Sequence, residues 1–210
     1  MIYETITIND YKFILQDARD KSHLLYMILK MNVELGLATN EIACAKISNL
    51  QQHSLDNYRF YTLKLDEGCK KVIINKKTRK TKARDRIVVC NSRLSDELFY
   101  FVRDKKHEGK EYIIQPERHA HDGVEKHYIE CLYRKHNIPF TPHATIKGIM
   151  GGRHLHKYLI ESVCVRKQCY SERQVEMHLG HKIHTDYTNY GAVLNIELMS
   201  HMVEETFVRV

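Results

Sequence analysis

Apolar and polar residues repeat with two different periods along the chain, and the changes of period divide it into three parts. Up to about residue 47, apolar positions recur every three or four residues, as on amphipathic helices. Thr7 is followed three residues later by Asp10, a spacing typical of a capping box, and Gly36 is placed to end a helix. We therefore expect three helices, with Thr39 capping the third: one after Thr7, whose apolar stripe begins with Tyr11, Phe13, Ile14 and Leu15, one over 22–36, and one over 40–47.

Strand-like alternation replaces the helical period in the middle of the chain. Residues 58–65, YRFYTLKL, place apolar side chains on alternate positions, and two short runs rich in valine and isoleucine follow. The predicted strands cover 58–65, 70–75 and 85–90, and a basic turn over 76–84 joins the last two.

Helical periods return after residue 95. Ser95 is a candidate cap for the first of these helices, and Ser171 with Gln174 suggests a capping box for a later one that ends at Gly180. The predicted helices cover 96–106, 124–137, 151–163, 171–180 and 195–205. Helices, then a small antiparallel sheet of three strands, then helices again indicate a mostly helical α+β domain, and we expect residues 1–210 to form a single one.

The composition is that of a globular protein, with 43% hydrophobic and 28% charged residues. No apolar run approaches the roughly 18 residues that cross a bilayer. The first ten residues, MIYETITIND, lack the basic and apolar regions of a signal peptide. These features predict a cytoplasmic or nuclear protein without a membrane partner, in which the six cysteines are reduced thiols.

Positive charge is concentrated in one segment. The net charge is +7, and residues 69–86, CKKVIINKKTRKTKARDR, hold nine Lys or Arg against the single acid Asp85. Such a cluster favours a polyanion through direct attraction and counterion release. A solvated basic hairpin without any partner is the alternative interpretation.

Four short segments carry the candidate chemistry. In chain order they are GLATNEIACAKISNL (36–50), KTKARDRIVV (80–89), GGRHLHKYLIES (151–162) and HLGHKIHTDYTNYG (178–191). The order resembles the catalytic domain of the tyrosine recombinases, or phage integrases. That family has a GLRxSE segment, a hairpin lysine, an arginine–histidine pair opening a helix, and Leu-Gly-His with the nucleophilic tyrosine nine residues beyond. Here Leu-Gly-His ends at His181, and Tyr190 stands at that offset.

The resemblance implies site-specific cleavage and rejoining of DNA through a 3′-phosphotyrosine intermediate. Tyr190 would be the nucleophile, Arg153 and His181 would lie around the phosphate, and Lys80 would protonate the departing 5′ oxygen. A tyrosine hydroxyl has a pKa of about 10 and needs cationic neighbours to attack as a phenolate. Neither a metal nor a nucleotide cofactor is required. The DNA-binding residues expected in the basic turn are Lys76, Lys77, Arg79, Lys82 and Arg84.

The resemblance covers the family's catalytic domain and not its N-terminal core-binding domain. It implies double-stranded DNA as the partner and a homo-oligomer, a dimer or tetramer, assembled on that DNA. The tail after Tyr190 is a candidate for docking on a neighbouring protomer. A recombinase of a mobile element, virus or plasmid acts in the cytoplasm, or in the nucleus or a viral factory of a eukaryotic host.

Two positions depart from the family pattern. Ala38 stands where the family has its first catalytic arginine, and Met150 stands where a histidine precedes the second. Three explanations are open: an inactivated relative that still binds DNA, another arginine such as Arg59 or Arg19 reaching the phosphate, or His143 replacing the missing histidine. Type IB topoisomerases and telomere resolvases share the chemistry and are further alternatives.

Other residues compete for some of these roles. Tyr187 is the rival nucleophile, and Lys77 and Lys82 also fit the hairpin. A metal site would draw on the histidine-rich C-terminal part, but Gly180 interrupts the helix and no HExxH pattern occurs, so no metal is expected. The histidines considered for it are His119, His121, His154, His156, His178, His181 and His184.

Overall fold

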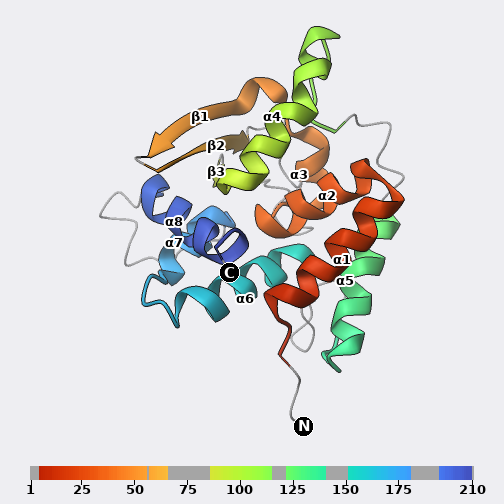
Figure 1. The fold of residues 1–210 in the computed structure, drawn as a ribbon, viewed down its shortest axis with the longest axis vertical. Helices are drawn as coiled ribbons and strands as arrows, with labels where there is room; N and C mark the ends of the chain where they lie inside the picture. Colours follow the sequence, from red (N-terminus) through yellow and green to blue (C-terminus); the bar gives the residue numbers. More distant parts are fainter. Residues whose placement is uncertain are drawn as a thin grey trace, which may run out of the picture.

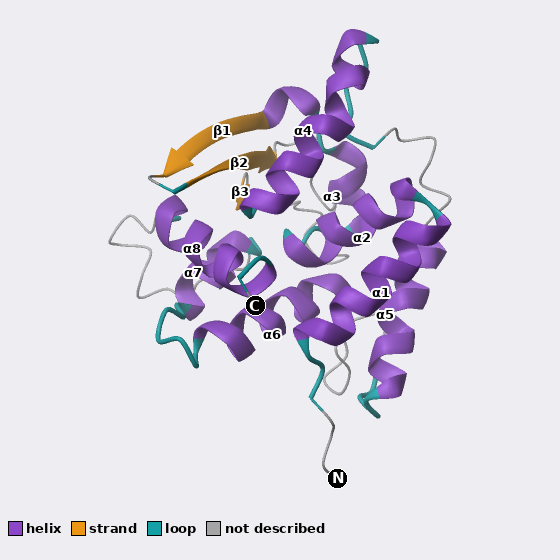
Figure 2. Ribbon diagram, in the orientation of Figure 1, coloured by secondary structure: helices purple, strands orange, loops and turns teal. Residues whose placement is uncertain are grey.

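The computed structural model describes residues 5–55, 57–65, 86–114, 122–140, 151–180 and 194–209, which form a mostly helical α+β fold (Figure 1, Figure 2). No helix within these ranges combines the length and the hydropathy that crossing a bilayer requires. The helices are Ile8–Lys21 (α1), His23–Glu34 (α2), Thr39–Cys44 (α3), Ser92–His107 (α4), Asp122–Lys135 (α5), Gly151–Cys164 (α6), Glu172–His178 (α7) and Ile196–Phe207 (α8), with a short 3₁₀ turn at Ile47–Asn49.

A small antiparallel sheet lies beside α4 (Figure 1). Its described strands are Leu50–Leu55 (β1), Tyr58–Leu65 (β2) and Arg86–Val89 (β3), in the order β1-β2-β3, with Leu63 opposite both Leu50 and Val88. β2 and β3 confirm the strands predicted over 58–65 and 85–90. β1 was not predicted, because its sequence LQQHSL lacks apolar alternation and lies on the exposed edge of the described sheet. The strand predicted over 70–75 lies outside the described residues.

Helix α2 occupies the centre of the helical part. Every residue from Tyr26 to Glu34 is buried, and the helix contacts α1, α3, α5 and α6. A helix that is buried all round must give each of its polar side chains a partner. Lys30 pairs with Glu97 at 2.6 Å, and the amide of Asn32 donates to the carbonyl of Leu37 at 2.8 Å. These polar contacts tie α2 to α4 and to the loop that precedes α3.

The C-terminal helix α8 packs on its own chain. It contacts α6, α7 and β3, and it buries Met199, Met202, Val203 and Phe207. The tail after residue 190 is a candidate for docking on a neighbouring protomer, and that docking stays a prediction. In this structure the apolar face of its helix is covered within the protomer, because that face completes the core beside α6.

Several helix ends agree with the sequence prediction and others correct it. The Thr7–Asp10 capping box is present, and Gly36 follows α2 with a left-handed φ of 60°. Phe13, expected in the apolar stripe of α1, is 75% exposed on its outer face. The cap of α3 is Ala38 and not Thr39, because the side chain of Glu41 accepts the Ala38 N–H at 2.7 Å.

Of the two predicted serine caps, Ser95 is wrong, and Ser171 is confirmed as the N-cap position of α7 but forms no capping box. Helix α4 begins at Ser92, because the side chain of Asn91 accepts the backbone N–H of Leu94 at 2.8 Å. Ser95 lies inside the helix, where its hydroxyl accepts the backbone N–H of Tyr61 at 2.9 Å. Ser171 precedes α7 without a side-chain cap, and Gln174 accepts the backbone N–H of Asn195 at 2.7 Å instead of closing a capping box.

A close approach of α6 to α2 predicts a strict requirement for glycine at position 152. A Cβ atom added there would lie 1.6 Å from the Oδ1 atom of Asn32, which is 4% exposed and cannot move aside without losing its bond to Leu37. Overpacking of a core commonly destabilises a protein by about 1–3 kcal/mol. We expect Gly152→Ala to lower the free energy of unfolding by at least that amount, measured by urea denaturation.

The neighbouring glycine provides the matched control. A Cβ at Gly151 would meet no atom within 4 Å. Gly151→Ala should therefore change the free energy of unfolding by no more than about 0.5 kcal/mol. Equal effects of the two substitutions would contradict the packing of α6 against Asn32.

Candidate functional site

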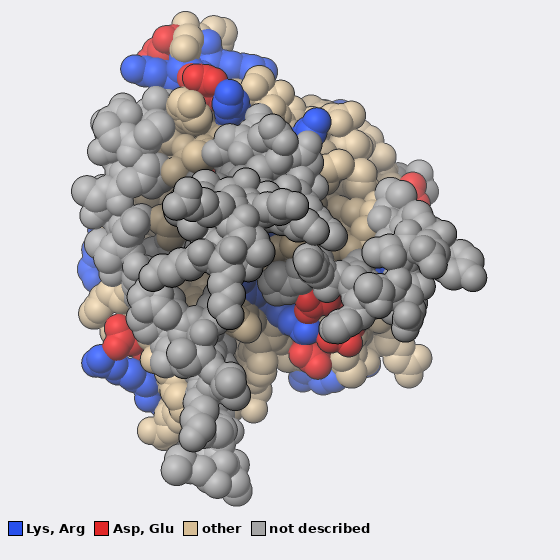
Figure 3. All heavy atoms as spheres, turned by 180° about the vertical axis from the view of Figure 1, so that it is seen from behind, with Lys and Arg blue, Asp and Glu red and all other residues tan. Residues whose placement is uncertain are grey.

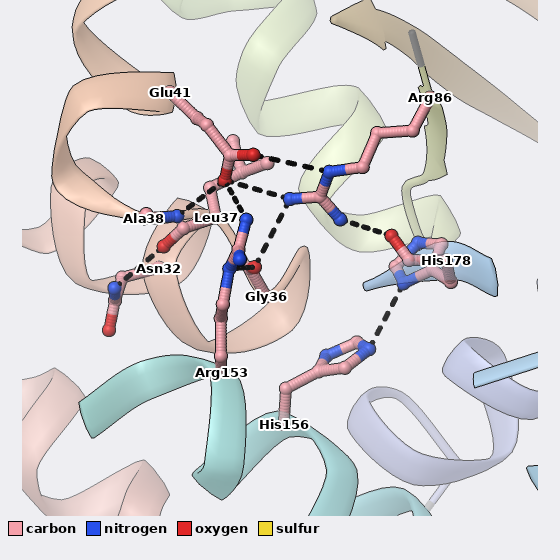
Figure 4. A network of polar contacts seen from close by, with 9 residues as sticks. All are labelled: Asn32, Gly36, Leu37, Ala38, Glu41, Arg86, Arg153, His156 and His178. Carbon is pink, nitrogen blue, oxygen red and sulfur yellow. Dashed lines mark hydrogen bonds and ion pairs between the residues drawn. The ribbon is translucent and has the colours of Figure 1, made fainter. Parts of the chain in front are cut away.

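Arg153 lies in the first turn of α6 and points toward the loop between α2 and α3 (Figure 4). Its Nε atom donates to the carbonyl of Gly36 at 3.0 Å, and its Nη2 atom pairs with the carboxylate of Glu41. The side chain is 24% exposed, so it is partly open to solvent. Of the four residues predicted to be catalytic, Arg153 is the one within the described ranges.

Glu41 is the centre of the cluster in Figure 4. Its Oε2 atom accepts the backbone N–H of Ala38 at 2.7 Å and also pairs with both Arg153 and Arg86, the latter at 2.8 Å. Burial by itself would raise the pKa of the Glu41 carboxyl, but the charges of the two guanidinium groups and the Ala38 N–H lower it below its ordinary value. Glu41 is therefore a stable anion that holds two cations.

Arg86, the first residue of β3, is the second of these cations. Its side chain is 6% exposed, and its Nε atom donates to Glu41 at 3.3 Å. The two terminal nitrogens donate to backbone carbonyls, one to His178 and the other to Gly36 at 3.4 Å. Arg86 therefore joins β3, the end of α7 and the loop before α3.

Two glycines make this approach possible. Gly36 has a φ of 60°, and its carbonyl accepts from both arginines, whereas a Cβ there would lie 2.5 Å from Leu179. Gly180 has a φ of 72°, and a Cβ there would lie 2.7 Å from the side chain of Arg86. Both positions need the left-handed backbone that glycine adopts without strain.

A pair of buried histidines lies beneath the arginines. The backbone N–H of Val89 donates to Nε2 of His178 at 2.8 Å, and Nδ1 of His156 contacts the carbonyl of Val33 at 2.8 Å. Because Val89 supplies a donor and Val33 an acceptor, each ring carries its proton on Nδ1. His178 then donates to Nε2 of His156 at 3.1 Å, and the two rings form one continuous neutral chain.

The environment keeps both rings uncharged. Burial lowers the pKa of His156 to about 3, and the nearby charges of Arg86 and Arg153 act in the same direction. Burial, together with His156 and Arg86, also lowers the pKa of His178 well below its usual range. Among the described residues no group of His, Cys, Asp and Glu is arranged to hold a metal ion. His156 and His178, considered as zinc ligands, therefore have a structural role in the described site.

The remaining predicted site residues lie outside the described ranges. These are Tyr190, His181 and Lys80, the DNA-binding set Lys76, Lys77, Arg79, Lys82 and Arg84, and the alternatives Tyr187, His143 and Met150. The two arginines suggested as substitutes for the family's first arginine do not join the cluster. Arg59 belongs to β2, and Arg19 on α1 lies over the ring of Tyr26.

Sequence reasoning missed Arg86 and Glu41. Both stand inside quoted segments, Glu41 in GLATNE and Arg86 at the start of RIVV. The available signal was the positive charge of Arg86 at the start of an apolar strand. Three of the four residues of β3, Arg86 among them, are buried, and a buried arginine needs an acidic partner. The identity of that partner could not be read from spacing, since 45 residues separate the two.

The described parts of the four segments quoted from the sequence therefore meet at one place. Residues 36–41, the start of β3, the first turn of α6 and the end of α7 all contact the Glu41–arginine cluster. No family model matches the chain, and no curated protein or solved structure shows significant similarity to it. Chemically, the arrangement holds the partly exposed side chain of Arg153 in a fixed direction. It also keeps His156 and His178 in their neutral, singly protonated form.

Removal of the central carboxylate should destabilise the fold. In Glu41→Gln the buried Arg86 keeps its charge but loses its ion pair with Glu41, and breaking a buried ion pair by removing one partner commonly costs about 3–5 kcal/mol. We expect a decrease of that size in the free energy of unfolding, measured by urea denaturation at pH 7. Glu161→Gln, an exposed position on α6, is the control and should change stability by less than about 0.5 kcal/mol.

The histidine chain predicts sensitivity to mild acid. Both folded-state pKa values lie below the unfolded value of about 6.5, so the stabilisation is complete above that pH and is lost as the pH falls. The slope should approach about 1.4 kcal/mol per pH unit for each histidine. Urea denaturation between pH 7 and 5 measures it. His156→Gln should have a shallower slope, whereas His127→Gln, on an exposed position of α5, should keep the full slope.

Proposed function

We propose that the protein is a catalytic domain of the tyrosine recombinase type, which cleaves and rejoins double-stranded DNA through a 3′-phosphotyrosine. The observation that supports this proposal is the meeting of the described parts of the four motif segments around Arg153. Segments separated by as many as 117 residues contact one another through side chains and carbonyls of the motifs themselves.

Arg153 has the properties of a phosphate ligand in this proposal. Its guanidinium is partly exposed, and its direction is fixed by Gly36 and Glu41. Attack on a phosphodiester adds negative charge to the nonbridging oxygens, which an oriented guanidinium stabilises. Tyr190 would attack the phosphorus, His181 would contact the phosphate, and Lys80 would protonate the leaving 5′ oxygen. The chemistry needs no metal or nucleotide cofactor.

Arg86 supplies a guanidinium near the position where the family has an arginine and this chain has Ala38. At Ala38 the family's arginine is replaced by a backbone N–H that binds Glu41. Arg86 brings a second guanidinium to the same carboxylate from β3. Because Arg86 is almost fully buried, we assign it a positioning role: it fixes Glu41, which in turn fixes Arg153.

A DNA-binding protein without chemistry is the second candidate. Ala38 and Met150 favour it, because each replaces a group that handles charge or protons in the family. On the face drawn in Figure 3, most of the visible Lys and Arg side chains lie next to Asp and Glu side chains. The basic cluster over 69–86 therefore remains the strongest attraction for DNA under either candidate. A topoisomerase-like or telomere-resolvase-like strand transferase would share the cleavage step.

The proposal includes double-stranded DNA and further copies of the chain as partners. Exchange of strands between two DNA sites needs a dimer or tetramer. The apolar face of α8 is used within the protomer, so the subunit contact would use another surface or an exchange of this helix. Action on DNA also implies a location in the cytoplasm, the nucleus or a viral factory.

A trapping experiment tests the chemistry. Incubation with nicked duplex DNA, followed by denaturing electrophoresis, should yield a covalent protein–DNA adduct that disappears in Tyr190→Phe. The adduct should persist in Tyr187→Phe, which removes a hydroxyl from the same segment. Salt-sensitive DNA binding without any adduct in the wild-type protein would favour a DNA-binding protein without chemistry. Loss of the adduct only in Tyr187→Phe would identify Tyr187 as the nucleophile.

Arg153→Ala in the same assay separates catalysis from affinity. Loss of one donor to the transition-state oxyanion commonly lowers the rate by about 10²–10³. Nonspecific affinity should fall by much less, since one phosphate contact among several contributes little. The unfolding curve of the variant must be recorded, because Arg153 also pairs with Glu41. A cleavage rate equal to the wild-type rate in a folded Arg153→Ala protein would contradict the assignment.

A further inference from the structure

A second feature with candidate chemistry is a cavity of about 210 Å³ among the N-terminal helices. Its walls come from α1 and α2, with Arg93 at the start of α4 and Phe207 at the end of α8. In Figure 1 the C-terminus lies close to α1, where these elements meet. None of the residues of the Glu41–arginine cluster lines it, so the cavity is distinct from the candidate site.

Positive side chains dominate the lining of the cavity. Lys12, Arg19, Lys30 and Arg93 face it, and Glu34 is the acid among the described residues that line it. The guanidinium of Arg19 lies 5.7 Å from the ring centroid of Tyr26 and has no ion pair with a described carboxylate. Arg19 therefore brings an uncompensated charge to the rim.

Lys30 is a buried cation in the lining of the cavity. It is 2% exposed, and it lies 2.6 Å from the carboxylate of Glu97 and 3.6 Å from that of Glu34. Burial by itself would lower the pKa of Lys30, but Glu34, Glu97 and Tyr26 raise it, so the ammonium group stays charged. Arg93, at the rim, lies 3.5 Å from the same Glu97.

The carboxylate of Glu34 is already occupied by protein donors. The amide of Asn91 donates to it at 2.7 Å and the hydroxyl of Tyr11 at 3.3 Å, besides its contact with Lys30. Burial raises the pKa of the Glu34 carboxyl, and Lys30, Asn91 and Tyr11 oppose that shift. Without counting Lys12, the three cations Arg19, Lys30 and Arg93 face the two carboxylates of Glu34 and Glu97, which leaves an excess of one positive charge.

Ile8, Leu15 and Phe207 add apolar surface to the lining, and a space of this size holds several heavy atoms, since a single water needs only about 10–15 Å³. Guanidinium groups match phosphate oxygens in geometry, and phosphate offers the negative charge that the excess cation of the lining attracts. We propose that this cavity binds a small phosphate-bearing anion, either inorganic phosphate or a phosphomonoester with a compact apolar group.

The test is a titration with two probes, inorganic phosphate and phenyl phosphate, against sodium chloride at equal ionic strength. Isothermal titration calorimetry and the unfolding temperature both report binding. The wild-type protein should bind at least one probe, and Arg19→Gln and Arg93→Gln should each weaken that binding about tenfold. Both residues lie on exposed parts of the rim, so their replacement should leave the fold intact. Tighter binding of phenyl phosphate would identify an organic phosphomonoester as the class of ligand.

Two control variants show where on the protein the phosphate probe binds. Arg134→Gln on α5 removes an exposed guanidinium away from the cavity and should bind both probes as the wild type does. Arg153→Gln should also keep this binding. If Arg153→Gln abolishes it and the rim variants do not, the phosphate binds at the candidate site, which overturns the cavity assignment and leaves the proposed function standing. The same affinity in all variants, or no binding of either probe, would also overturn it.

Discussion

The carboxylate of Glu41 is the interaction on which the candidate site depends. One oxygen atom accepts from the backbone of Ala38 and from the guanidinium groups of Arg86 and Arg153, which belong to three separate elements. A buried guanidinium without a counter-charge costs several kcal/mol, so these elements are stable only as a set. The direction of Arg153 is consequently a property of the whole arrangement, because the group that holds it is itself held from α3 and β3.

Helix α2 supports two regions that differ in their chemistry. On one side Asn32 and Val33 hold the loop before α3 and the ring of His156, beneath the arginines. On another side Lys30 and Glu34 form the floor of the cationic cavity. Apart from this cavity, α2 is packed against other helices, and close-packed interiors have few voids to absorb a displacement. A ligand that tightened α2 against α1 would also act on the support of the arginine cluster.

The sequence predicted the fold class and most of the elements, and it predicted the candidate site in part. Long amphipathic helices and the alternating strand β2 leave a periodic pattern because one face of each is buried. β1 leaves none, since an edge strand is held by backbone pairing, and the start of α4 was misplaced because Asn91 competes with Ser95 as a cap. The pairing of Glu41 with Arg86 depends on tertiary contacts, and local patterns contain no information about partners so far apart in the chain.

The hydrogen bonds through His178 and His156 all run in one direction, from the N–H of Val89 to the carbonyl of Val33. A proton relay along them would need both rings to reverse, which would set a lone pair against the carbonyl of Val33 and a second N–H against that of Val89. Such a reversal leaves two buried groups without partners at opposite ends. The buried imidazoles of His156 and His178 thus do not conduct protons, and an acid or base that acts on a ligand of Arg153 would need another route of approach.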